Sequence, residues 1–163
     1  MEEIFKTIDE YEADMLIVCM LNNAVWFIHM ELNINNWNIL FGDGVVTPIG
    51  KVKIGENQYA KLLQKGRVKE FGLIKETLIN PDIILKESTK TCTKPIDRPF
   101  SYLFIKAFKV SDNDRKIFMS VSIKKDSLEI IVSSHYVRLA ALRKKLLKDL
   151  LIYKNRSIIL QQL

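Results

Sequence analysis

The spacing of apolar residues near the start of the chain predicts an amphipathic helix over residues 2–21, with acidic residues on its other face. The next segment, residues 24–44, mixes short aromatic and β-branched runs with Asn pairs and closes on Gly-Asp-Gly, which predicts short strands or a hairpin. The apolar run at residues 15–28 is interrupted by Asn22-Asn23 and contains no stretch of about 20 apolar residues, so we expect no membrane span.

Two helices and then a set of strands are predicted in the middle of the chain. Residues 45–55 have the pattern of a short strand with Pro48 near its edge. A helix within residues 55–67 should stop near Gly66, and a second over residues 68–80 should end before Pro81.

The second half of the chain alternates apolar and polar residues as strands do. Strands are expected at residues 82–86, 101–109, 116–124 and 127–135, with Lys125-Asp126 at a hairpin-like spacing. Residues 135–154 follow with the pattern of a basic amphipathic helix. The chain is therefore expected to fold as one α+β domain built on a small antiparallel sheet.

The alternation in the last two predicted strands sorts their residues onto two faces. If Lys124 pairs with Ser127, one face is purely apolar, and a one-residue slip would mix the two sets. The other face then gathers the polar side chains Ser120, Ser122, Glu129, Ser133 and His135. We therefore expect these five residues to cluster.

A row of aromatic residues in the strand at 101–109 has two interpretations. Tyr102, Phe104 and Phe108 alternate there with Lys106. Such a row can stack on unpaired bases while the ammonium group meets a phosphate, and stacking contributes on the order of 1 to 3 kcal/mol per base. The alternative is a second hydrophobic layer covered by helices, with Lys106 reaching outward.

Charge divides the chain near residue 43. Residues 1–43 carry one Lys against eight Asp or Glu, a net −7, whereas the other 120 residues carry 24 Lys or Arg against 11 Asp or Glu, a net +13. A basic body of this size attracts polyanions such as nucleic acid or an anionic membrane surface, although a lysine-rich solvated surface would look the same. We expect an acidic N-terminal extension at residues 1–43 and a main domain at residues 44–163.

The cysteines and histidines argue against a disulfide framework and a metal site. Cys19 and Cys92 form no Cys-x-x-Cys pair, and His29 and His135 lie in no metal-binding motif. The N-terminus is acidic, unlike a secretion signal. We therefore expect a cytoplasmic protein that uses neither a metal nor another cofactor.

His135 is the one imidazole in the basic part of the chain. The ordinary histidine pKa near 6.5 makes both protonation states accessible at neutral pH. Histidines at strand ends are more often structural than catalytic, but predicted neighbours such as Glu129 and Ser133 offer a second proton carrier and a hydroxyl group. Glu129 would alternatively be a solvated residue that balances nearby lysines.

Four segments that occur in order make residues 45–155 similar to the phage Barnase-EndoU-colicin-RelE-like nucleases: GENQYAKLLQKGR, FGLIKETLINPDIIL, RPFSYLFIKAF and FMSVSIKKDSLEIIVSSH. The acidic first 43 residues lie outside this resemblance. The resemblance implies helices on one face of a small antiparallel sheet and a ribonuclease-like active site on the other. It also implies metal-free cleavage, in which a base takes the ribose 2′-OH proton, an acid protonates the 5′-oxygen, and a 2′,3′-cyclic phosphate forms first.

The resemblance further implies roles for individual residues. Glu129 and His135 would divide the base and acid roles, with Ser133 orienting one of them. Lys106 would stabilise the developing phosphate charge, and Arg67 would bind a phosphate through two hydrogen bonds. The candidate substrate contacts are Lys75, Thr77, Arg98, Tyr102, Ser120, Ser122 and Lys124.

Three functions are open on the sequence. The first is a metal-independent endoribonuclease, a prophage toxin-type effector that acts on tRNA or other cellular RNA and has a cognate inhibitor protein. The second is a nucleic-acid-binding module without the chemistry, and the third is a phage-associated structural protein. Residues 1–43 would either complete the core or compete with RNA for a basic cleft.

Overall fold

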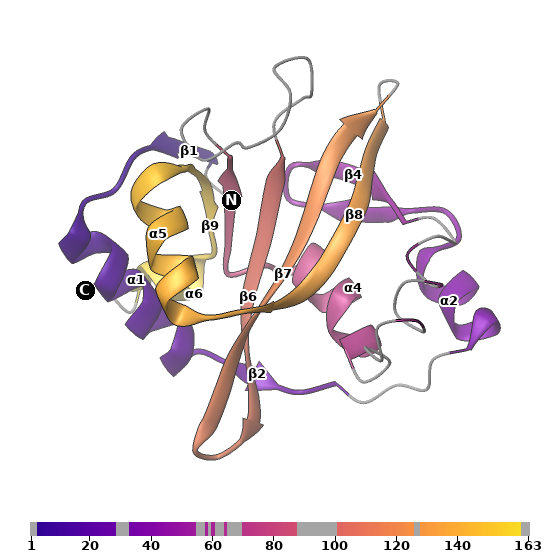
Figure 1. The fold of residues 1–163 in the computed structure, drawn as a ribbon, viewed down its shortest axis with the longest axis horizontal. Helices are drawn as coiled ribbons and strands as arrows, with labels where there is room; N and C mark the ends of the chain where they lie inside the picture. Colours follow the sequence, from indigo (N-terminus) through magenta and orange to yellow (C-terminus); the bar gives the residue numbers. More distant parts are fainter. Residues whose placement is uncertain are drawn as a thin grey trace.

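The computed structural model describes residues 3–28, 33–54, 58, 60, 64, 70–87, 101–125 and 128–160. They form an α+β fold with a mostly antiparallel sheet, which confirms the predicted fold class (Figure 1). The helices are α1 (Glu10–Asn22), α2 (Ile34–Phe41), α4 (Phe71–Ile79), α5 (Leu139–Lys148) and α6 (Arg156–Leu160). The strands are β1 (Glu3–Lys6), β2 (Val25–Trp26), β3 (Val45–Thr47), β4 (Gly50–Lys53), β5 (Ile83–Lys86), β6 (Tyr102–Ser111), β7 (Asp114–Lys125), β8 (Leu128–Val137) and β9 (Leu150–Lys154).

The sheet runs in the order β1-β9-β5-β6-β7-β8-β4-β3. Its middle is the antiparallel set β6, β7 and β8, and β4 pairs with β8 in parallel. The short strand β2 also pairs with β6 in parallel, beyond the part of β6 that pairs with β5. The strands predicted in the second half of the chain are confirmed within about two residues at each end.

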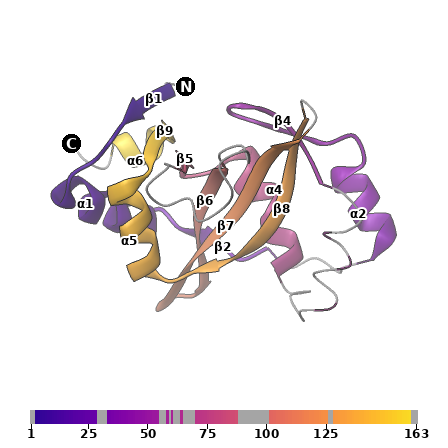
Figure 2. The same ribbon diagram turned by 45° about the horizontal axis from the view of Figure 1, so that its top comes forward.

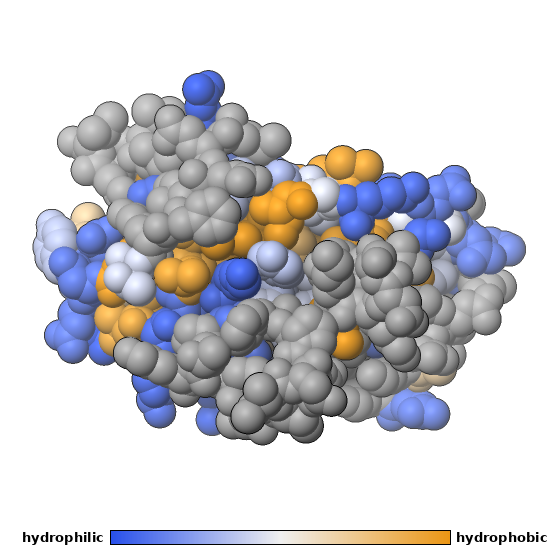
Figure 3. Space-filling view, turned by 90° about the horizontal axis from the view of Figure 1, so that it is seen from above, coloured by the Kyte–Doolittle hydropathy of each residue, from blue (hydrophilic) through white to orange (hydrophobic). Residues whose placement is uncertain are grey.

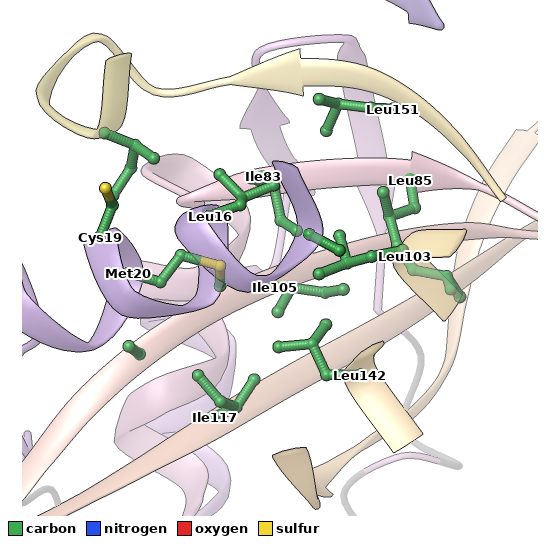
Figure 4. Close-up of a cluster of buried hydrophobic side chains, with 14 of the residues drawn as sticks. Leu16, Cys19, Met20, Ile83, Leu85, Leu103, Ile105, Ile117, Leu142 and Leu151 are labelled. Carbon is green, nitrogen blue, oxygen red and sulfur yellow. The ribbon is translucent and has the colours of Figure 1, made fainter. Parts of the chain in front are cut away.

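Helices cover both faces of the sheet. The α5 face carries α1 and α5 over a core that includes Leu103 and Ile105, which Figure 4 shows from close by. The α4 face carries α4 over a core that includes Phe104 and Phe108. Figures 1 and 2 agree in placing α1, α5 and α6 together, away from α2 and α4. The family resemblance implied helices on one face, but the central strands need cover on both because neighbouring residues such as Ile83 and Ile84 are both buried.

The N-terminal segment takes part in the core. Helix α1 begins at Glu10 rather than at residue 2, because the Asp9 side chain caps it by accepting from the Glu12 amide at 2.8 Å. Leu16 and Met20 pack on the α5 face, and the strand β1 pairs with β9. These contacts support the role of residues 1–43 as an extension that completes the core.

Helix α2 lies where the sequence predicted short strands or a hairpin, so that prediction is wrong for residues 34–41. The helix begins because the Asn33 side chain accepts from the Asn36 amide at 2.8 Å. One turn further on, Trp37 and Phe41 pack with ring centroids 4.8 Å apart. Strand β2, before it, is the part of the prediction that is confirmed.

Helix α5 is shorter than the basic helix that the sequence predicted over residues 135–154. It ends at Lys148, and Leu150–Lys154 forms strand β9 between β1 and β5. Three consecutive residues of β9, Leu151, Ile152 and Tyr153, are all buried, which fits a strand with covered faces. The helix predicted before Pro81 is confirmed as α4, whereas the helix predicted within residues 55–67 falls mostly outside the described residues.

Within the described ranges, no helix is long and apolar enough to cross a membrane. On the face of the molecule seen from above, the hydrophobic residues of the described surface are interspersed with hydrophilic ones (Figure 3).

Candidate nucleic-acid site

The hairpin between β7 and β8 is paired differently from the prediction. Lys125 pairs with Leu128 and Lys124 pairs with Glu129, so the predicted pairing of Lys124 with Ser127 is wrong. The difference is a shift of two residues, which leaves every residue on the side where the prediction placed it because alternate residues share a face. The apolar pattern therefore could not distinguish the two registers.

A β-bulge then reverses the alternation of β8. Ser122 lies opposite Ile131, but its neighbour Val121 lies opposite Ser133, so Val132 is an extra residue on β8. Residues of β8 after the bulge consequently face the side opposite to the predicted one.

His135 and Ser133 both lie on the α5 face as a result. His135 is opposite Met119, a member of the α5-face core, and Ser133 is opposite Val121, which packs against that core. Both residues are half-buried. His135 therefore lies on the side of the sheet away from α4. Ser133, two residues earlier on β8, is its neighbour on the same side.

The predicted cluster of these residues with Ser120 and Ser122 is wrong. Ser120 and Ser122 face α4 and are 0% exposed. The hydroxyls of Ser120 and Ser134 share a hydrogen bond of 2.9 Å within the α4-face core. The bulge is the cause, because it moves Ser134 onto the α4 face and Ser133 and His135 off it.

Lys106 forms a buried ion pair instead of a phosphate site. Its Nζ donates to the Asn80 carbonyl oxygen at 2.7 Å and lies 3.4 Å from Asp82 Oδ1, and both charged residues are 3% exposed. Asp82 Oδ2 also accepts from the Ala107 amide at 2.9 Å. Burial raises the pKa of Asp82, although the charge of Lys106 opposes the rise. The structure thus places Lys106 neither on an RNA-binding surface nor reaching outward to solvent.

The aromatic row of β6 is a covered layer. Phe104 and Phe108 are 0% exposed, and Phe108 packs edge-on against Phe118 at 6.4 Å. Tyr102 is half-buried against the same core. The interpretation of this row as a hydrophobic layer under helices is confirmed, and the stacking surface proposed for it is wrong.

Other predicted contacts lie on α4 or outside the described residues. Thr77 is 0% exposed and its hydroxyl donates to the Leu73 carbonyl oxygen at 2.8 Å, while Lys75 is half-buried on the same helix. Neither lies on the face that carries His135. Four predicted side chains are not described: Arg67, Arg98, Lys124 and Glu129.

The backbone separates Glu129 from His135. The two residues are six apart on β8, roughly 20 Å along an extended strand. The bulge also interrupts the alternation between them. The prediction that they share one phosphate as base and acid does not fit this spacing.

Burial also affects Tyr136, the residue that follows His135. Its ring packs edge-on against Phe118 on the α4 face at 5.6 Å, with Lys116 Nζ 5.2 Å from the ring centroid. Burial raises the pKa of Tyr136 to about 12, and the charges of Glu70 and Asp114 add to the rise. The phenol is therefore a weaker acid than that of an ordinary tyrosine.

The sequence interpretation missed two lysines of β4. Lys51 and Lys53 are exposed, while Val52 between them is buried in the α4-face core, so both lysines lie on the α5 side. Lys53 is opposite Ile130 of β8. The Lys-Val-Lys alternation was the available signal.

The candidate site is the part of the α5 side formed by β7, β8 and β4, and we call it the β8 face. In Figure 1 this part of the sheet faces the viewer, and α5 lies over the other half of the sheet. Its described members are Lys51, Lys53, Val121, Ile123, Ser133 and His135.

Residues 38–154 match the sequence model of one protein family, described as phage-Barnase-EndoU-ColicinE5/D-RelE like nuclease2. The match covers well over half of the chain, from within α2 to the end of β9, and includes the whole β8 face. Comparison with curated proteins and with solved structures gave no match. The chain therefore belongs to the phage-Barnase-EndoU-ColicinE5/D-RelE like nuclease2 family.

Proposed function

We propose that this nuclease is a metal-independent endoribonuclease that binds RNA on the β8 face. Membership of a nuclease family supports nucleic acid as the substrate. The proposed position of the RNA rests on one observation, namely that His135 and Ser133 lie together on the side of the sheet away from α4. Lys51 and Lys53 give the same side a positive edge that suits a polyanion.

His135 is the proposed proton acceptor. It takes the proton of a ribose 2′-OH, the bond from the 2′-oxygen to phosphorus forms, and the bond from phosphorus to the 5′-oxygen breaks. A water molecule supplies the proton to the leaving 5′-oxygen. The products are a 2′,3′-cyclic phosphate and a 5′-hydroxyl end. Ser133 is two residues away on the same side, roughly 7 Å along the strand, where its hydroxyl can donate to a phosphate oxygen.

Lys51 and Lys53 are proposed to bind phosphates that flank the cleaved one. Lys53 lies opposite Ile130, five residues before His135, which is roughly 16 Å along β8. A lysine side chain cannot cover that distance, so the two cations serve neighbouring nucleotides. Their contribution should appear as salt dependence of binding.

We further propose that the protein is a prophage toxin-type effector in the cytoplasm, with tRNA or another cellular RNA as its target and a cognate inhibitor protein. The phage reference in the family description supports the prophage setting. Metal independence rests on the chemistry proposed for His135 and the lysines. In the part of the chain that the structure describes, no group of three His, Cys, Asp or Glu residues is placed to hold a metal ion.

A second candidate function is nucleic-acid binding without cleavage. The observation that favours it is the position of Lys106, Ser120 and Ser122, which are buried on the α4 side and cannot assist His135. A protein with an altered site would retain the cations of the β8 face and bind RNA without cutting it.

Incubation of the purified protein with total RNA in EDTA tests the proposal. We expect cleavage to 2′,3′-cyclic phosphate ends, and His135→Ala should lower the rate by roughly 10²- to 10⁴-fold. Lys148→Ala, at an exposed position on α5, is the control and should cleave at the wild-type rate. Equal rates for His135→Ala and wild type would remove His135 from the mechanism, whereas tight binding without any cleavage would favour the second candidate.

A further inference from the structure

Trp26 presents an indole ring to solvent that core packing does not explain. It is 55% exposed, whereas Trp37 is 2% exposed. Trp26 lies in β2, the two-residue strand that pairs with β6 near the end of the β6–β7 ribbon (Figure 1). Large aromatic side chains contribute most to stability when buried, so an exposed indole held in a sheet is a candidate contact surface.

Two cations lie beside this indole. Lys109 is opposite Trp26 on β6, with its Nζ 5.1 Å from the ring centroid, which is a cation–π contact. Arg115 is opposite Lys109 on β7 and is exposed. Trp26, Lys109 and Arg115 therefore form one row across three adjacent strands, which we call the Trp26 row.

The Trp26 row lies on the same side of the sheet as His135. Lys109 follows Ile105 at an even spacing on β6, and Ile105 is opposite Met119, which is itself opposite His135. Four residues of β6 separate the two rows, or roughly 13 Å. Because β2 and β8 are also three strand spacings apart, or roughly 14 Å, Trp26 and His135 lie roughly 19 Å from each other, a distance that about six stacked nucleotides span at 3.4 Å each.

The charge of the row is positive. Asp114, at the start of β7, falls on the α4 side, where its charge raises the pKa of Tyr136. Asp112 lies in the exposed turn and contacts Arg115 through its backbone oxygen at 2.9 Å. The three side chains of the row thus combine an exposed π surface with two cations, the combination that single-stranded nucleic-acid sites use.

We propose that the Trp26 row is a second RNA subsite, in which one unpaired base stacks on Trp26 while Lys109 and Arg115 bind the adjoining phosphates. The inference rests on the proposed nuclease function, because it assumes that a strand bound at His135 reaches the Trp26 row by passing around α1 and α5, which cover Ala107 and Ile117 between the two rows. The subsite selects single-stranded RNA over a duplex, since stacking requires a base outside a helix. It carries no sequence preference of its own, because every base has a π face.

Binding of a fluorescein-labelled oligothymidine, followed by fluorescence anisotropy, tests this subsite apart from cleavage. A 2′-deoxy strand lacks the nucleophile of the proposed reaction and stays intact. Trp26→Ala should weaken the affinity roughly 5- to 150-fold, the range expected for the loss of one stacked base. Trp26→Tyr should retain most of the affinity. Tyr11→Ala removes an aromatic residue that is 74% exposed on α1 and should bind like wild type.

The emission of Trp26 provides a second measurement. In a Trp37→Phe variant, Trp26 is the one remaining tryptophan of the chain. Oligothymidine should then quench the tryptophan emission with the same dissociation constant that anisotropy gives. Emission that does not change at saturating oligothymidine would overturn the stacking contact.

The outcomes separate this inference from the nuclease proposal. Equal affinities of Trp26→Ala and wild type overturn the subsite, even if RNA is cleaved in a way that depends on His135. Loss of binding in Trp26→Ala supports the subsite, even if the wild type cleaves no RNA, which would contradict the nuclease proposal. A wild-type protein that binds no oligothymidine also overturns the subsite and would favour a protein partner for this row.

Discussion

Replacing Lys106 with methionine tests whether this lysine serves the fold or the substrate. Its ammonium group lies 2.7 Å from the Asn80 carbonyl oxygen and 3.4 Å from Asp82, and the side chains of Lys106 and Asp82 are 4% and 5% exposed. Methionine keeps an unbranched apolar side chain and removes the charge. Asp82 would then keep the hydrogen bond from the Ala107 amide at 2.9 Å but lose its buried cation.

We expect Lys106→Met to lower the free energy of unfolding by about 3 kcal/mol at pH 7. Removal of one partner from a buried ion pair costs about 3–5 kcal/mol. The lower end applies because the Ala107 amide still donates and because 3.4 Å is long for a charge-assisted hydrogen bond.

The loss should depend on pH. Burial raises the folded-state pKa of Asp82 above 3.8, and the charge of Lys106 partly opposes this rise. Removal of Lys106 should therefore raise the pKa of Asp82 further. A carboxyl group whose pKa is higher in the folded state stabilises the fold while it is protonated, and this stability is lost as the pH rises through the folded-state pKa. The deficit of Lys106→Met should therefore be largest at neutral pH and shrink on acidification.

Urea unfolding followed by circular dichroism at pH 7 and at pH 5 measures both effects. Lys148→Met, at an exposed position, is the matched control and should change the free energy of unfolding by less than about 0.5 kcal/mol. Adding Asp82→Asn to Lys106→Met should recover part of the loss, since a neutral amide needs no counter-charge. A Lys106→Met protein as stable as wild type but unable to cleave RNA would refute the structural role and restore Lys106 to the substrate site.

Two further substitutions test the packing around the α4 face. A methyl group at Gly72 would lie 2.5 Å from the Ile28 carbonyl oxygen, so Gly72→Ala should destabilise the protein by about 1–3 kcal/mol in thermal unfolding, and a raised melting temperature would show that the contact is absent. Ser134→Ala removes the hydroxyl that shares a hydrogen bond with buried Ser120, so it should cost about 1–3 kcal/mol in urea unfolding. RNA cleavage by the folded Ser134→Ala protein should be unchanged, and its loss would contradict a purely structural role for this pair.

The elements that the sequence predicted well are those whose patterns are local. Strands β6 to β8 follow from alternation, and the end of α4 follows from Pro81. Helix α2 was missed because its N-cap, Asn33, sits in a segment rich in Asn, where a turn was equally reasonable. The run at residues 150–154 suits a helix or a strand, and pairing with β5 decides between them.

The site was harder to predict because its geometry depends on contacts between distant segments. A single extra residue, Val132, moves His135 to the other side of the sheet, and alternation alone gives no sign of it. The burial of Lys106 depends on Asp82, 24 residues earlier in the chain. In contrast, the exposure of Lys51 and Lys53 could have been predicted from the sequence. The Lys-Val-Lys alternation is typical of a strand that buries its apolar residue, here Val52, and exposes the two lysines.

Nuclear magnetic resonance of the histidine rings tests the central claim most directly, namely that substrate meets the β8 face. Uniformly ¹⁵N-labelled protein is titrated with an uncleavable single-stranded oligonucleotide, and a His135→Gln variant distinguishes the ring signals of His135 from those of His29. We predict that the His135 ring signals shift and saturate, while the backbone amides of Lys106 and Ser120 on the α4 side do not. Saturable shifts at Lys106 and Ser120 with an unchanged His135 ring would contradict the account.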